Sequence, residues 1–98
     1  MPINVEIHEE VETKIGSFGI SAKVRERMIE TLLSDLQTIP ASQLPIYVFA
    51  PVVLRSHAVA VPDGDTLHHF VFGMMTSSDS RRIIGVDYRV SGPDTLTQ

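Results

Sequence analysis

The side chains best suited to chemistry are arginines and histidines in the second half of the chain. The segment Leu67–Val90, LHHFVFGMMTSSDSRRIIGVDYRV, is typical of two strands joined by a polar turn. Successive strand residues point to opposite faces, so simple alternation places His69 on one face with Arg81 and Arg89 of the second strand. Arginine and histidine on an exposed sheet face are suited to gripping a phosphate and moving a proton.

A plainer interpretation of these arginines stays open. Exposed arginines commonly serve solubility, and Asp79 or Asp87 could neutralise them in surface ion pairs. Arg55 and His57 also share one face of an earlier segment, VVLRSHAVAV. Its continuous apolar run leaves undecided which face of that strand is exposed.

Several classes of site are disfavoured by the residue types. The chain has no cysteine, which excludes disulfides and thiolate chemistry. Neighbouring His68 and His69 point to opposite strand faces and cannot chelate one ion together, and no zinc-ligand spacing occurs. Glycine-rich phosphate loops and a serine elbow are also lacking. We therefore expect neither a metal nor another cofactor.

The charge balance disfavours nonspecific nucleic-acid binding. Twelve acidic and eight basic residues leave a net charge of −4, whereas phosphate-binding surfaces are strongly basic. All four basic residues after residue 43 are arginines, which favour forked contacts with phosphate. A local arginine patch on an acidic molecule therefore remains an expectation.

The elements that would position these residues follow from hydrophobic periodicity. Residues 3–7 alternate as a half-buried strand, and a short helix follows in EEVETKIGSF. Ser21 is a plausible N-cap for a helix over residues 22–37 with an apolar stripe at i, i+4 spacing. Pro40 and Pro45 then release an extended chain.

Three late strands follow these helices. Pro51 indicates an edge, a bulge or a break between two short strands. The Val61–Thr66 segment, VPDGDT, predicts a tight turn, and residues 76–80 predict a second one. The order β-α-α-β-β-β is typical of a two-layer α+β fold with an antiparallel sheet on two N-terminal helices. We expect one domain over residues 1–91 and a loose polar tail over residues 92–98.

Alternation also predicts which face of the last two strands enters the core. The expected core residues are Phe70, Phe72, Met74, Ile84, Val86, Tyr88 and Val90. Their neighbours would form a mixed face that is free to meet a partner.

This layout resembles the RelE/ParE toxin superfamily. The resemblance covers INVEIHEEVETKIGSFGISAKVRERMIETLLSDL, then LRSHAVAVPDGDTLHHFVFGM and RRIIGVDYRV. It implies a bacterial toxin held inactive by an antitoxin polypeptide wrapped around the sheet and helices. RelE-like members cut mRNA on the ribosome, and ParE-like members inhibit DNA gyrase.

The resemblance also implies roles for individual residues. Arg55, His69 and Arg89 would match the catalytic basic positions of the open sheet face, whereas Tyr88 falls on the core side and matches the family's tyrosine poorly. The substrate-binding positions would be His57, Arg81 and Arg82. An endoribonuclease of this kind would use arginines to stabilise phosphate charge and histidine as acid or base.

A second hypothesis needs no catalysis. The open face or an edge strand could bind a protein partner or a second copy, forming a homodimer. Neither a secretory signal nor a membrane span is recognisable, because the longest apolar stretch is short and contains Pro51. The expected location is the cytoplasm.

Overall fold

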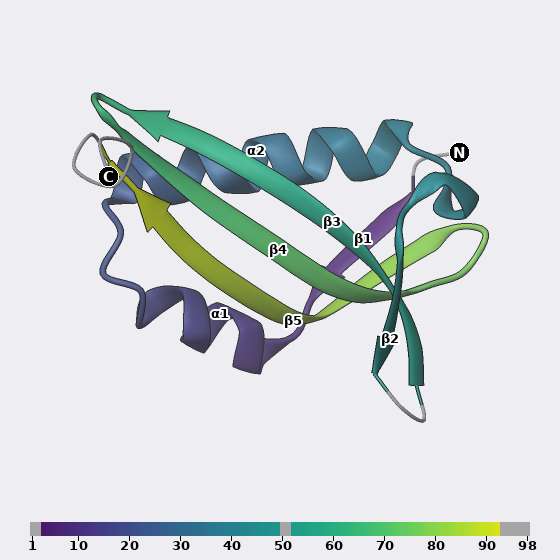
Figure 1. Cartoon of the computed structure of the whole chain (residues 1–98). Helices are drawn as coiled ribbons and strands as arrows, with labels where there is room; N and C mark the ends of the chain where they lie inside the picture. Colours follow the sequence, from purple (N-terminus) through teal and green to yellow (C-terminus); the bar gives the residue numbers. More distant parts are fainter. Residues whose placement is uncertain (1–2, 50–51, 93–98) are drawn as a thin grey trace.

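Two helices and a five-stranded sheet form a two-layer α+β fold (Figure 1). The computed structural model describes residues 3–49 and 52–92. In chain order the elements are β1 (Asn4–Ile7), α1 (Glu9–Gly16), α2 (Ala22–Thr38), the 3₁₀ turn η1 (Ala41–Gln43), β2 (Ile46–Phe49), β3 (Val52–Asp63), β4 (Thr66–Thr76) and β5 (Ser80–Ser91). The predicted fold class is confirmed. Pro51 and the predicted tail residues 93–98 lie outside the described residues.

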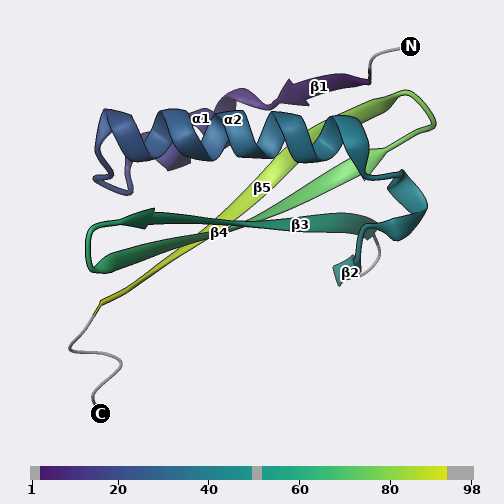
Figure 2. The same cartoon turned by 90° about the horizontal axis from the view of Figure 1, so that it is seen from above.

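Both helices lie on one side of the sheet (Figure 2). Ser21 caps α2 as expected, because its hydroxyl accepts a hydrogen bond from the Val24 amide at 3.2 Å. His8 caps α1 in the same way, through Nδ1 and the Glu10 amide. The buried residues of α2 recur every fourth position, which is the stripe expected of a helix packed on a sheet: Val24, Met28, Leu32 and Leu36.

The strand order in the sheet is β1-β5-β4-β3-β2. Neighbouring strands from β2 to β5 are antiparallel, but β1 pairs in parallel with β5 through residues 4–7 and 80–83. The prediction of an antiparallel sheet is therefore correct only for the later strands. The first strand, β1, forms one edge of the sheet and lies beside the last strand, β5.

A tight hairpin joins β3 and β4. Asp63 pairs with Thr66, which leaves Gly64 and Asp65 as the loop. Gly64 takes a φ of 60°, a left-handed conformation that glycine adopts without steric strain. This confirms the predicted turn and fixes the register of both strands.

A β-bulge changes the face assignment of β5. Gly85 pairs with Gly73, but the next pair is Ile83 with Met74, so Ile84 has no partner on β4. Residues before the bulge therefore have the opposite parity from the one that uninterrupted alternation predicts. Ile83 is fully buried, whereas Ile84 is 38% exposed.

Two further predictions about β5 were wrong. Arg81 was expected on the open face but is only 2% exposed and lies under the helix layer, because the bulge reverses its parity. Val90 was expected in the core, yet it is 54% exposed near the end of the strand. Val86 and Tyr88, which follow the bulge, pack with the core as predicted.

Adjacent residues of β4 offer a test of this face assignment. Replacing the buried Phe72 by alanine should lower the free energy of unfolding by about 3–5 kcal/mol, because it leaves a large cavity. The matched variant Val71→Ala removes a side chain that is 43% exposed and should cost about 1 kcal/mol or less. Urea unfolding of both variants measures the difference. Equal costs would contradict the assignment.

Candidate functional site

The candidate site is the open face, the side of the sheet opposite the helices. Its residues come from alternate positions of β3, β4 and β5, and within the described residues no helix covers them (Figure 2). The face includes Ser56, Ala58, Ala60, His69, Val71, Gly73, Met75, Arg82, Ile84, Gly85, Asp87 and Arg89. Most of these side chains are small or apolar.

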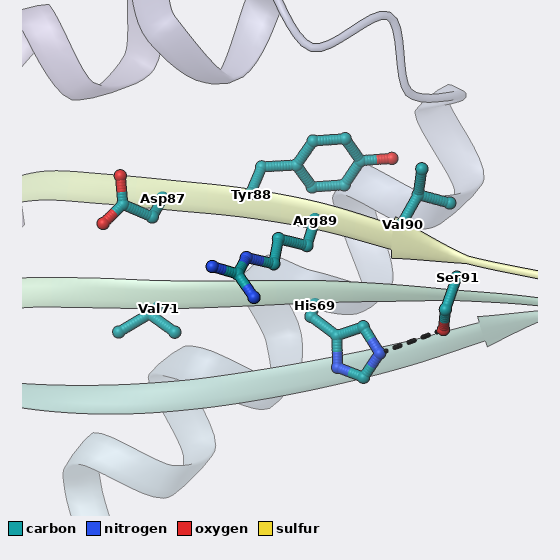
Figure 3. A pocket seen from close by; sticks show the side chains of 7 residues that line it. All are labelled: His69, Val71, Asp87, Tyr88, Arg89, Val90 and Ser91. Atoms are coloured by element: carbon teal, nitrogen blue, oxygen red, sulfur yellow. Dashed lines mark hydrogen bonds between the residues drawn. The ribbon is translucent and has the colours of Figure 1, made fainter. Parts of the chain in front are cut away.

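His69 and Arg89 lie directly opposite each other on β4 and β5 (Figure 3). The Nε2 atom of His69 is hydrogen-bonded to the Ser91 hydroxyl at 3.2 Å. Arg89 forms no ion pair within the described part of the chain, and its side chain reaches over the neighbouring strand. Together they line a shallow hollow of about 790 Å³. One guanidinium and one imidazole could hold a single anionic group there.

Two other predicted site residues face the helices instead. Arg55 pairs with the buried Met74 and donates from Nη1 to the carbonyl of Leu44 at 2.9 Å. His57 Nε2 lies 2.8 Å from a carboxylate oxygen of Asp35 on α2. Arg55 therefore connects β3 to the segment that leads into β2, and His57 connects β3 to α2. Neither lies on the face that carries His69.

Arg81 is a buried structural residue. Its Nη1 donates to the carbonyls of Ser77 and Ser80 at 2.8 and 2.9 Å, while its Nε has no hydrogen-bond partner in the described structure. The guanidinium thus closes the turn between β4 and β5. Its predicted role in substrate binding does not fit this position.

Arg82 does lie on the open face, but far from Arg89. It pairs with Met75, whereas Arg89 pairs with His69, so roughly 20 Å of strand separates the two arginines. Glu6 approaches Arg82 at 3.9 Å. Of the six residues predicted for the site, only His69 and Arg89 come together.

The middle of the open face is apolar. Val71, Met75 and Ile84, which we call the apolar strip, are 43%, 52% and 38% exposed. Beside them a hollow of about 430 Å³ is lined by Leu54, Ser56, Gly73 and Gly85. Alternation missed Ile84 because it assigned this residue to the core. A partner's apolar side chains could be buried against this strip.

An aromatic cluster occupies the opposite face near the end of β5. Tyr88 stacks on Phe18, and its hydroxyl is 2.7 Å from Nδ1 of His68. Burial raises the pKa of Tyr88 above its usual value of 10.0. This placement agrees with the expectation that Tyr88 belongs to the core side rather than to the open face.

Comparison with known proteins adds no assignment, since no family model, no curated protein and no solved structure matches the chain. The described residues contain no cluster of three or more His, Asp or Glu side chains suited to a metal ion. None of the helices in residues 3–49 and 52–92 is long and apolar enough to cross a membrane.

The contrast between two arginines of β5 can be tested directly. Arg81→Ala should lower the free energy of unfolding by about 2–4 kcal/mol, because it empties buried volume and removes the hydrogen bonds that the guanidinium donates to the Ser77 and Ser80 carbonyls. Arg89→Ala removes an exposed side chain and should change it by about 0.5 kcal/mol or less. Chemical denaturation of both variants decides this. A stable Arg81→Ala variant would contradict the structural role.

Proposed function

We propose that this chain is a protein-binding domain of RelE/ParE-like layout, and that its partner docks on the open face. The observation that carries the proposal is the exposed apolar strip of Val71, Met75 and Ile84 in the middle of that face. Contact between water and exposed apolar side chains is unfavourable, so covering these three side chains with another polypeptide is favourable.

The charges on the open face support a protein partner over a phosphate backbone. Arg82 has Glu6 beside it, and Lys14 approaches Asp87 at 3.8 Å. Asp87 also precedes Arg89 by two residues on the same strand face. Local charges are thus nearly balanced, and the whole chain carries −4. Apolar contact is the stronger source of affinity here.

The resemblance to RelE/ParE toxins suggests the class of partner. Toxins of that superfamily are held by an antitoxin polypeptide that wraps the sheet and helices. Val71 and Met75 lie two residues before and two residues after Gly73 on β4. A partner segment whose apolar side chains are spaced to contact both would suit this face. The proposed partner is therefore an antitoxin-type polypeptide.

The polypeptide encoded beside the gene of this chain is the probe for this proposal. Calorimetric titration should detect a complex, and Val71→Glu with Met75→Glu should weaken it by at least about 100-fold, because a carboxylate is then buried against apolar groups. The matched control is Leu33→Glu, which alters a similarly exposed side chain on α2. Absence of a complex, or equal affinity for all variants, would contradict the proposal.

A second candidate function is mRNA cleavage at the ribosome, as in RelE-like toxins. The specific observation in its favour is the His69–Arg89 pair with Ser91 beside it. In that mechanism Arg89 stabilises the developing phosphate charge while His69 transfers the proton.

Arg82 is a matched control for this second function, because it is an exposed arginine of the same strand and face. His69→Ala and Arg89→Ala should each slow ribosome-dependent mRNA cleavage by about 100-fold, whereas Arg82→Ala should change it by only a few-fold. Growth arrest on expression should follow the same order. Wild-type protein that neither cleaves mRNA nor arrests growth would rule this function out.

A further inference from the structure

The centre of the open face combines a protruding side chain with a neighbouring hollow. The bulge pushes Ile84 outward, and Gly73 and Gly85 leave the adjoining rung without side chains. A Cβ added to Gly85 would meet no atom within 4 Å, and one added to Gly73 would meet only Leu54 at 3.7 Å. The open face therefore carries a protruding side chain, Ile84, and beside it a hollow that could receive an apolar side chain.

The residues around this rung are arranged symmetrically. On β4, Val71 and Met75 lie two rungs to either side of Gly73. On β5, their partners Asp87 and Arg82 lie at the same two levels. Consider a two-fold axis that runs above the open face, parallel to the line from Gly73 to Gly85. Half a turn about this axis places Val71 of one copy over Met75 of the other, and Asp87 over Arg82.

We propose that the open face is covered by a second copy of this chain, packed face to face about a two-fold axis at the Gly73–Gly85 rung. Met75 then packs on Val71 of the second copy, and Arg82 faces Asp87 of the second copy, each contact occurring twice. Ile84 enters the hollow beside the glycines. The inference rests on the proposed function, since it takes the open face as a protein-binding surface and names what covers that face when the antitoxin-type polypeptide is absent.

The ion pairs that Arg82 and Asp87 already form are weak enough for both side chains to take a new partner in a dimer. Arg82 is held by Glu6 at 3.9 Å and Asp87 by Lys14 at 3.8 Å, and all four side chains are more than half exposed. Pairs this long and solvated contribute little. Arg82 and Asp87 become partly shielded from water between two sheets, where the attraction between opposite charges is stronger.

Sedimentation equilibrium at about 100 µM protein, well above a micromolar Kd, tests the inference. The wild-type chain should have twice the 10.8 kDa mass of one chain. Asp87→Arg sets arginines against each other across the axis and should weaken dimerisation by at least about tenfold. Adding Arg82→Asp to the same chain restores opposite charges and should recover most of that loss.

The control is Glu30→Arg on the exposed side of α2, which should leave the dimer unchanged. Unfolding midpoints of all variants show whether each one folds. A monomeric wild-type chain would overturn the inference, as would a dimer insensitive to Asp87→Arg or a double variant that fails to recover. A monomer that still binds the neighbour-encoded polypeptide through Val71 and Met75 would overturn only the dimer and leave the proposed function standing.

Discussion

The β-bulge at Ile84 is the constraint on which the two faces of the sheet depend. β5 must place Ile83 and Val86 in the same core although their spacing in sequence is odd. A regular strand would expose one of them to water, and burial of such a side chain is worth about 1.5–3 kcal/mol. One unpaired residue resolves the conflict, because it reverses the parity of everything before it.

The same bulge decides which residues of the RRII segment reach the open face. It moves Arg81 beneath the helices, where two turn carbonyls hold the guanidinium, and it brings Arg82 onto the open face in its place. In the same way Ile84 replaces Ile83 on that face. A face expected to carry His69, Arg81 and Arg89 carries the His69–Arg89 pair, an apolar centre and, at its far end, Arg82 beside Glu6. The number of arginines and isoleucines from this segment on the face is the same with either parity. The bulge changes their positions, and it places Ile84 beside the Gly73–Gly85 pair at the apolar centre.

Much of the architecture could be predicted from local patterns, and the errors have physical causes. The stripe of α2, its Ser21 cap and the turn at Gly64 each follow from neighbouring residues, so the helices and hairpins were correctly predicted. The bulge lies in RRIIG, where two arginines precede two isoleucines and both parities match equally well. Only packing against the helices chooses between them. The placement of His57 likewise depends on Asp35, a helix residue far away in sequence.

The parallel pairing of β1 with β5 has a consequence for how the chain folds. These strands lie at opposite ends of the described sequence, so the ladder from Asn4 to Ile7 cannot close until Ser80–Ile83 has been synthesised. Until then the apolar stripe of α2 has no complete sheet to cover it. Folding must therefore follow synthesis of nearly the whole domain, and the large loop that has to close slows it. During that interval the nascent helices expose their apolar stripes, as chaperone substrates do.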